Sequence, residues 1–313
     1  MIGESPFTIL LGNAFKRLDE IARDSVQVVV TSPPYWGQRD YGSAEQIGLE
    51  ASPHDYVSAI VRVFRKIRRV LTDDGTVWLN IGDTYAGGGN GGGGSFAKDG
   101  IHLANKNQQA TWKNEIGRVP RGWKTKDLIG IPWRVAFALQ DDGWFLRQDI
   151  IWHKPNPMPE SVRDRCTKAH EYIFLLSKSE KYFFDHEAIR EIGTYPAGTR
   201  AAKGSARRAG TKRVNSRPPE YKIYDGFRNK RSVWTVATKP SGTNHYATYP
   251  VELVTPCILA GSRPGQLVLD PFAGTGTTAE IALRLNRRAL AIELNPRFGR
   301  LIGKRCRAAI RNL

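Results

Sequence analysis

Long apolar runs and cysteine are both scarce in this chain of 313 residues. No stretch of about 18 consecutive apolar residues occurs, so the sequence predicts no membrane-spanning helix and no membrane partner. The first six residues lack the basic and apolar segments of a signal peptide, and we expect none. Three isolated cysteines, Cys166, Cys257 and Cys306, exclude a disulfide framework and a CxxC metal site. These absences predict a protein of the reducing cytoplasm that has no metal centre.

Acidic residues are outnumbered by basic ones, 30 against 47, which gives a formal net charge of +17. The excess lies in two segments: residues 186–244 carry a net charge of +9, and residues 284–313 carry +8. Lysine and arginine gain free energy when they displace counterions from phosphates, so this distribution predicts a nucleic-acid partner. A solvated basic surface that only aids solubility is the alternative.

The spacing of apolar residues predicts alternating strands and helices. Residues 26–30 form a β-branched apolar run typical of a buried parallel strand, and residues 56–71 have apolar positions at helical spacing. Asp73-Asp74-Gly75 is expected to end that helix before a second strand at residues 76–81. This order predicts a right-handed crossover and therefore a parallel α/β sheet. The same periodicities predict strands at residues 7–11, 145–152, 172–177, 267–269 and 289–292, and helices at residues 131–139, 277–285 and 297–310.

A glycine-rich segment, GGGNGGGG at residues 87–94, follows the second of these strands. It is not a phosphate-binding P-loop, because no Gly-Lys-Ser or Gly-Lys-Thr comes after it. Glycine-rich backbone is costly to order. The segment is therefore either a surface loop or a flap that orders on substrate.

A second glycine motif lies near the end of the chain, where residues 267–276 read LVLDPFAGTG. A strand that enters a glycine turn and then a helix lets a ligand approach backbone N–H groups closely. Glu293, 17 residues beyond Gly276, ends the next strand, where a carboxylate can accept hydrogen bonds from both ribose hydroxyls. The pattern predicts an adenosine-type cofactor. Because Gly274-x-Gly276-x-x-Ala279 also fits the relaxed dinucleotide fingerprint, NAD is a rival at this point.

The segment Thr31-Ser32-Pro33-Pro34-Tyr35 follows the strand at residues 26–30. Two prolines hold the backbone extended, so the Ser32 hydroxyl and the Pro33 carbonyl can accept the two protons of an exocyclic amine. Tyr35 offers an aromatic face on which a base can stack. These groups suit methylation of an amino nitrogen on a base that has left the helical stack. A proline-rich turn with a packed tyrosine is the structural alternative.

Together, the Ser-Pro-Pro-Tyr segment, the DPFAGTGTT turn and Glu293 resemble the amino-group DNA methyltransferases that use S-adenosylmethionine. The order of these motifs, with the Ser-Pro-Pro-Tyr segment first and the cofactor turn last, resembles the β class. The resemblance implies a circularly permuted, seven-stranded Rossmann-like α/β methyltransferase sheet with an inserted basic target-recognition region. It divides the chain into a catalytic part at residues 1–185, a recognition region at residues 186–244 and a cofactor-binding part at residues 245–313.

The resemblance also assigns site residues. The catalytic residues are Ser32, Pro33, Pro34 and Tyr35. The residues expected to bind S-adenosyl-L-methionine are Asn13, Thr31, His245, Asp270, Phe272, Ala273, Gly274, Gly276, Thr277 and Glu293. Asn13 stands where family members often carry aspartate, and His245 belongs to a segment that resembles the one closing the methionine side of the pocket. The residues expected to contact DNA are Arg200, Lys203, Arg207, Arg208, Lys212, Arg213 and Arg217.

Residues 152–157 and 165–171 resemble family segments that lie near the flipped base. Single histidines such as His153 and His170 are more often structural than catalytic. Trp36, next to the Ser-Pro-Pro-Tyr segment, is a candidate wall of the base pocket.

The resemblance implies a DNA methyltransferase that acts on double-stranded DNA in the cytoplasm, associated with the nucleoid, and it allows a homodimer. Serine at the first motif position favours cytosine N4 as the target, and adenine N6 is the alternative. A C5-cytosine enzyme needs a cysteine thiolate, but Cys257 has no basic partner in the sequence around it. An NAD-dependent enzyme leaves the Ser-Pro-Pro-Tyr segment unexplained, and a non-catalytic DNA-binding protein leaves both motifs unexplained.

Overall fold

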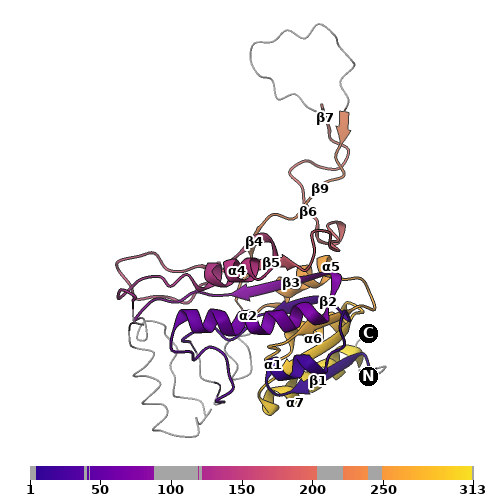
Figure 1. Ribbon diagram of the computed structural model, residues 1–313. Helices are drawn as coiled ribbons and strands as arrows, with labels where there is room; N and C mark the ends of the chain where they lie inside the picture. Colours follow the sequence, from indigo (N-terminus) through magenta and orange to yellow (C-terminus); the bar gives the residue numbers. More distant parts are fainter. Residues whose placement is uncertain are drawn as a thin grey trace. The chain divides into compact units, whose positions relative to one another are not determined.

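The computed structural model describes residues 5–38, 41, 43–87, 119, 122–202, 221–238 and 249–311. The chain forms two compact units, and each is described by itself. The first unit comprises Met1–Phe184 and Ser232–Leu313, and the second comprises Asp185–Arg231 (Figure 1). Most of the predicted segment at residues 87–94 lies outside the described residues.

The first unit is built on one large sheet. Within the described residues this sheet has eight strands in the order β1-β12-β11-β2-β3-β5-β4-β10. All neighbours run parallel except β5, which is antiparallel to both β3 and β4. The strands are β1 (Phe7–Leu11), β2 (Val26–Thr31), β3 (Leu71–Ile81), β4 (Phe145–His153), β5 (His170–Ser177), β10 (Val233–Thr235), β11 (Leu267–Asp270) and β12 (Arg288–Glu293).

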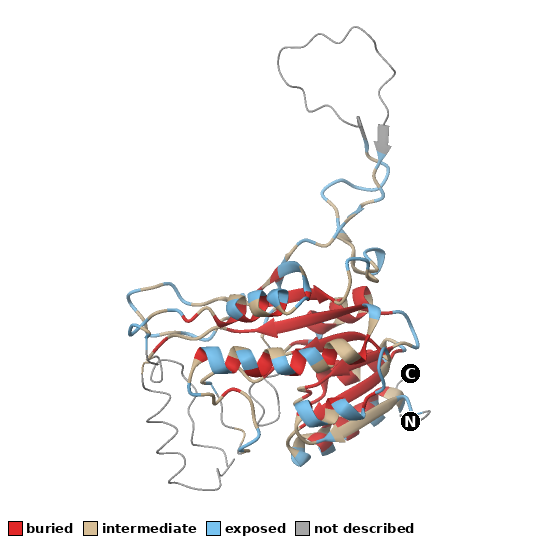
Figure 2. Cartoon of the chain, in the orientation of Figure 1, coloured by how far each residue is buried: buried red, intermediate tan, exposed pale blue. Residues whose placement is uncertain are grey.

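Helices cover both faces of this sheet, as expected for a doubly wound α/β fold. One group contains α1 (Ala14–Arg17), the short 3₁₀ helix η1 (Leu18–Glu20), α2 (Pro53–Val70) and α4 (Ile131–Asp141). The other group contains α5 (Val251–Gly261), α6 (Thr277–Arg284) and α7 (Pro296–Arg311). Figure 2 shows the buried strands of the sheet, and helix α2 in front of them with both buried and exposed residues along its length.

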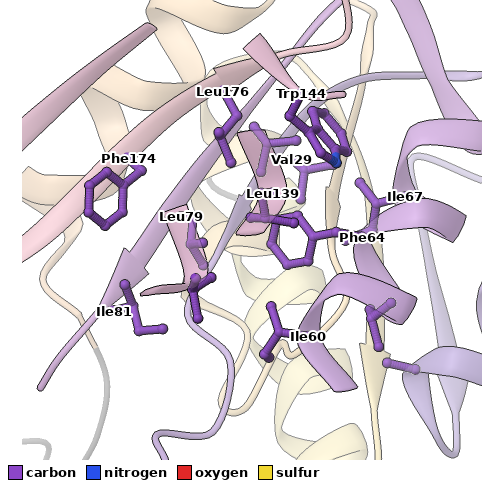
Figure 3. Close-up of a cluster of buried hydrophobic side chains, with 14 of the residues drawn as sticks. Val29, Ile60, Phe64, Ile67, Leu79, Ile81, Leu139, Trp144, Phe174 and Leu176 are labelled. Atoms are coloured by element: carbon purple, nitrogen blue, oxygen red, sulfur yellow. The ribbon is translucent and has the colours of Figure 1, made fainter. Parts of the chain in front are cut away.

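Helix α2 illustrates how the sequence sets these elements. The Ser52 hydroxyl accepts a hydrogen bond from the Asp55 backbone N–H at 3.1 Å, and Pro53 occupies the first turn, so both signals start the helix. Ile60, Phe64 and Ile67 lie on one face at helical spacing and are buried in the main core. They pack toward side chains from the sheet and α4, as Figure 3 shows. This packing holds helix α2 against the sheet.

The structure confirms the predicted fold class and corrects two details. In the described part of the chain the large sheet has eight strands, not seven, because the three-residue strand β10 pairs with β4. This strand was too short to predict, and it buries Trp234 against Trp78 at 6.2 Å between ring centroids. Helix α2 ends at Val70, so the predicted helix end at Asp73-Asp74-Gly75 was wrong, since these residues lie in β3. The described helices include none that is long and apolar enough to cross a bilayer.

The second unit carries short strands and ion pairs. It contains the 3₁₀ helix η2 (Glu187–Ile189) and two antiparallel pairs, β6 (Glu191–Ile192) with β9 (Phe227–Arg228) and β7 (Arg200–Ala202) with β8 (Tyr221–Ile223). Arg190 pairs with Asp225 at 2.6 Å, and Arg228 pairs with Glu191 at 2.9 Å. The predicted recognition region at residues 186–244 extends beyond this unit, because β10 belongs to the large sheet.

Candidate active site

A cavity of about 710 Å³ lies at the carboxyl ends of neighbouring parallel strands. Its walls come from the ends of β2 and β12, the glycine turn after β11, the start of α1, and helix α2. Ligands of open α/β sheets bind outside the carboxyl ends of the strands, and a cavity of this size is typical of a small-molecule site. The fold therefore places the candidate site where the sequence motifs predicted it.

The cavity brings together most of the predicted residues from both motifs. Those that line it are Asn13, Ser32, Pro34, Phe272, Ala273, Gly274, Thr277 and Glu293. Those that do not line it are Thr31, Pro33, Tyr35, Asp270 and Gly276. His245 lies outside the described residues.

The glycine turn depends on backbone conformations that favour glycine. Gly274 and Gly276 have φ values of +53° and +84°. A Cβ atom at Gly276 would lie 3.0 Å from two side-chain carbons of Ile302 on α7. The close approach of α7 and the left-handed backbone both require glycine, and together they hold the turn against the start of α6.

Glu293 is the buried acid of the cavity. Its Oε2 accepts a hydrogen bond from the Gly274 N–H at 2.7 Å, and its Oε1 accepts one from the Asn295 N–H at 2.8 Å. The residue is only 8% exposed, and this burial raises the pKa of Glu293 to about 7 despite the two backbone donors. Each carboxylate oxygen retains capacity for a further donor, so the group can accept hydrogen bonds from a bound diol.

Asp270 lies behind the cavity wall and joins the two motifs. It is 2% exposed and accepts hydrogen bonds from the hydroxyls of Thr31, Thr278 and Tyr249 at 2.7, 2.8 and 2.8 Å. The Phe272 N–H donates to it as well, at 3.1 Å. Burial raises the pKa of Asp270, while these donors oppose the shift. The carboxylate thus ties the end of β2 to the glycine turn.

Asn13 lines the cavity, but the polar atoms of its side chain make hydrogen bonds within the protein. Its Oδ1 caps α1 by accepting hydrogen bonds from the N–H groups of Phe15 and Lys16 at 2.9 and 3.4 Å. Its Nδ2 donates to the Glu45 carbonyl at 2.7 Å. Both polar ends of the amide are therefore engaged within the protein.

A polar cluster surrounds the hydroxyl of Tyr35. Tyr35 Oη donates to Glu171 Oε2 at 2.7 Å and lies 3.1 Å from Asn80 Oδ1. The Ser32 hydroxyl donates to Tyr35 Oη at 3.3 Å. A Cβ atom at Gly82 would lie 2.6 Å from Tyr35 Cε2, so the ring packs directly on that glycine. The cluster joins the ends of β2 and β3 to the start of β5.

The Glu171 carboxylate is held in its charged form. Burial alone would favour the neutral acid, but the Lys154 ammonium, the Tyr35 hydroxyl and the Asn80 amide lower the pKa of Glu171. Burial and the charge of Glu171 together raise the pKa of Tyr35 well above its usual value. The Tyr35 hydroxyl therefore stays protonated and donates to a charged acceptor.

Three further residues from the family-like segments lie near this cluster. Lys168 Nζ is buried with no hydrogen-bond partner in the described residues, and burial lowers the pKa of Lys168. Burial also lowers the pKa of His170, whose ring meets Tyr172 edge-on. His153 Nδ1 lies 3.1 Å from Thr235 Oγ1. The described residues include no cluster of His, Cys, Asp and Glu that could hold a metal ion.

Several cavity residues were missed by sequence reasoning. The loop from β2 to α2 contributes Tyr41, Glu45, Ile47 and Glu50, and α2 contributes Arg62. Neither set carries a motif, because polar loop residues and the charged face of a helix look alike whether or not a ligand lies nearby. Trp36 packs against the main core and donates to the Glu50 carbonyl at 2.9 Å.

Of the seven residues predicted to contact DNA, only Arg200 belongs to the described residues. Arg200 is exposed in β7 of the second unit, and the other six residues lie outside the described residues.

Cys257 is buried in α5, where its thiol donates to the Leu253 carbonyl, as expected for a structural cysteine.

A family model described as DNA methylase, covering N6 and N4 methyltransferases, matches residues 26–304. The chain belongs to this DNA methylase family. It is 46% identical to the type II methyltransferase M.Cfr9I of Citrobacter freundii over 93% of this chain and 84% of that protein. It is 45% identical to M.XycI of Xanthomonas campestris pv. cyanopsidis, over 95% of this chain and 87% of that protein. It is 44% identical to M.SmaI of Serratia marcescens, over 95% and 89%.

Solved structures of methyltransferases share the fold. The cytosine-N4-specific PvuII DNA methyltransferase matches with a TM-score of 0.62 at 19% identity, over 96% of this chain and 86% of that one. A putative DNA modification methylase of Thermus thermophilus, complexed with S-adenosyl-L-methionine, matches with a TM-score of 0.61 at 22% identity, over 98% and 96%. The methyltransferase is thus an S-adenosylmethionine-dependent enzyme that acts on DNA amino groups. This result confirms the predicted family and cofactor, and it rules out the NAD-dependent and non-catalytic alternatives.

Proposed function

We propose that this methyltransferase modifies the N4 amino group of cytosine in double-stranded DNA, and that Ser32 and the Pro33 carbonyl hold the amine. One observation carries the amine-holding role: Ser32 lines the cavity while its hydroxyl proton is directed to Tyr35 Oη, 3.3 Å away. The choice of cytosine rests on serine at the first position of the Ser-Pro-Pro-Tyr motif. A hydroxyl whose proton is committed to a neighbour presents only its lone pairs to an incoming donor. Such an acceptor suits an amine that brings two protons.

In this mechanism the residues of the chain hold and orient the reacting amine. The Ser32 oxygen and the Pro33 carbonyl accept its two protons, which draws the nitrogen lone pair out of conjugation with the ring. Pro34 shapes the turn, and Tyr35 offers a face of its ring to the base. Glu171 acts as a positioning residue, because it accepts a hydrogen bond from the Tyr35 hydroxyl, which in turn orients the Ser32 hydroxyl. The cost of moving the base out of the stack, a few kcal/mol, is offset in part by these contacts.

The cofactor fits the same cavity. When bound, S-adenosylmethionine supplies a methyl group on a positively charged sulfonium. We assign the ribose hydroxyls to Glu293 and the cofactor's close contact with backbone to the turn at Phe272, Ala273 and Gly274, with Thr277 beside it. The buried, pre-oriented carboxylate of Glu293 supports this assignment. Asp270, Thr31 and Gly276 act as positioning residues behind the wall, and Asn13 shapes the wall as the cap of α1.

We further assign target recognition to the second unit, because its segment of the chain is strongly basic. Arginine and lysine in this segment would contact phosphates, and a subset would read base edges. A homodimer and association with the nucleoid also belong to the proposal. Sedimentation analysis and fluorescence microscopy of tagged protein are the corresponding tests.

The decisive test of the target atom is mass spectrometry of nucleosides. Unmethylated duplex DNA is incubated with the protein and S-adenosylmethionine and then digested. N4-methylcytosine is the expected product, and N6-methyladenine would overturn the cytosine assignment while retaining the amine-holding role of Ser32. Ser32→Ala should abolish methylation with cofactor binding retained, whereas Ser58→Ala, on the exposed face of α2, should leave it intact.

A further inference from the structure

Helix α7, labelled in Figure 1, is the last helix of the chain. It carries a row of exposed basic side chains. This basic stripe consists of Arg297, Arg300, Lys304, Arg307 and Arg311, all of which are exposed. Their spacings alternate between three and four residues, which places them on one face of a helix. They include most of the basic residues in the charged segment at residues 284–313 that the catalytic cavity does not use.

The stripe has no counter-charge in the part of the chain that the structure describes. None of the five side chains makes an ion pair or a hydrogen bond there. Arg297 also lies in the first turn of the helix, where the positive end of the helix dipole repels its charge. Two other arginines nearby behave differently: Arg284 and Arg305 both pair with Glu280. Like charges at these spacings repel one another. A bound polyanion would relieve that repulsion.

The opposite face of α7 is buried in the protein. Ile302, Cys306 and Ala309 on that face are at most 1% exposed. An interfacial membrane helix needs a free apolar face to insert among lipid chains, and α7 has none to offer. The helix therefore presents its charges from a fixed scaffold, which favours a polyanion in water over a lipid surface.

The stripe starts at the catalytic cavity. Pro296 and Phe298, in the first turn of α7, line the cavity that also contains Ser32. From Arg297 to Arg311 the helix rises about 21 Å, and duplex DNA carries about one phosphate charge per 1.7 Å of axis. A duplex whose target base enters the cavity thus offers many phosphates within reach of a scaffold of this length.

We propose that the basic stripe is a second DNA-contact surface that binds the phosphate backbone without reading sequence. It is separate from the contacts predicted in the second unit, because α7 belongs to the first unit. Its task is to add affinity for any duplex and to hold DNA at the methyltransferase while the site is searched. This inference does not depend on which base is methylated.

The test measures binding of the full-length protein to a duplex of random sequence by fluorescence anisotropy, at NaCl concentrations from about 50 to about 200 mM. The double variant Lys304→Gln/Arg307→Gln should bind about three- to tenfold more weakly, and the slope of log K against log [NaCl] should become less steep by about 2. The matched control, Arg23→Gln/Lys181→Gln, removes the same charge at exposed positions outside the stripe and should bind as wild type.

Further variants and assays distinguish a loss of charge from a loss of folding and DNA from a lipid surface. The charge-conserving variant Lys304→Arg/Arg307→Lys should retain binding, which separates charge from folding, and S-adenosylmethionine binding should be equal in all variants. An equal loss in the control would overturn the proposal in favour of a net-charge effect. Unchanged DNA binding in the Gln variant would also overturn it, and a simultaneous loss of binding to phosphatidylserine vesicles would then identify a lipid surface as the partner.

Discussion

Tyr35 and Glu171 are 136 residues apart in the sequence, yet Tyr35 Oη donates a 2.7 Å hydrogen bond to Glu171 Oε2. The carboxylate is charged and lies partly buried beside Lys154, so the direction of the Tyr35 proton is fixed. The Ser32 hydroxyl, which donates to the same Tyr35 oxygen, is fixed in turn. The acceptor proposed to hold the target amine therefore depends on a residue that does not line the cavity.

Glu171→Gln should slow methyl transfer with little effect on cofactor affinity. The amide keeps the shape of the side chain but removes the charge, and loss of a hydrogen bond to a charged group costs about 1.5–3 kcal/mol. We expect kcat to fall about 10- to 100-fold, with the Kd of S-adenosylmethionine changed less than twofold. Single-turnover methylation and calorimetry measure the two quantities.

A double-mutant cycle separates this positioning role from a general loss of stability. Tyr35→Phe should cost a similar factor, and Tyr35→Phe/Glu171→Gln should be hardly worse than either single variant. Additive losses would show that the two residues act independently. A Glu171→Gln protein that methylates at the wild-type rate would refute the positioning role without touching the proposed role of Ser32.

Gly82→Ala should reproduce this catalytic defect through packing alone. The new Cβ would lie 2.6 Å from Tyr35 Cε2, so the ring must move away from its place beside Glu171. We expect kcat to fall at least tenfold, with a smaller change in cofactor binding. Gly303→Ala is the matched control, because its Cβ would lie 3.3 Å from the flexible end of Arg307 and 3.6 Å from Ile9 Cδ1, an ordinary van der Waals contact. Comparable activity in the two variants would contradict the packing argument.

Sequence patterns were sufficient for the elements that carry continuous local signals. The apolar run of β2 and the glycine turn predicted both the parallel sheet and the edge of it at which the cavity lies. Gly276 is a clear example, because its left-handed backbone and its contact with Ile302 leave room for no other residue. These constraints on backbone conformation and packing act within one short segment, so they can be recognised from the sequence.

Long-range polar contacts could not be predicted in the same way. Asp270 was predicted to bind the cofactor, but it does not line the cavity, and its carboxylate accepts hydrogen bonds from three hydroxyls, one of which belongs to Thr31, 239 residues away in the sequence. The sequence around Asn13 is compatible with a ligand contact and with a helix cap. It does not distinguish the two, because α1, the helix that Asn13 caps, is only four residues long. Strand β10 has three residues and depends on Trp234 for its burial, so periodicity alone does not detect it.

The raised pKa of Glu293 predicts that cofactor affinity depends on pH. Hydroxyl donors of a ribose bind the charged carboxylate more strongly, and that form becomes dominant as the pH rises through about 7. Calorimetric affinity for S-adenosylmethionine should therefore increase from pH 6 to pH 8. Glu293→Gln should bind about tenfold more weakly and lose this pH dependence. An unchanged pH dependence in the variant would assign it to another group.

The same shift has the opposite consequence for the stability of the free protein. Because the pKa of Glu293 is higher in the folded state than its unfolded value of 4.5, folding binds a proton between these two values. The stabilising contribution is complete below pH 4.5 and is lost as the pH rises through about 7. Without cofactor, wild type should lose more free energy of unfolding than Glu293→Gln between pH 5 and pH 8, as measured by urea denaturation.

Asp270→Asn should destabilise the fold rather than alter cofactor contacts directly. The carboxylate accepts hydrogen bonds from Thr31, Thr278 and Tyr249, and an amide would turn one acceptor oxygen into an NH₂ group facing these hydroxyls. A buried polar group left without a partner costs about 1–3 kcal/mol, so the free energy of unfolding should fall by that amount. Asp141→Asn, at an exposed position at the end of α4, is the control and should unfold as wild type. If Asp270→Asn weakened cofactor binding strongly at unchanged stability, Asp270 would belong to the cofactor site itself, because a residue that only ties β2 to the glycine turn must affect folding first.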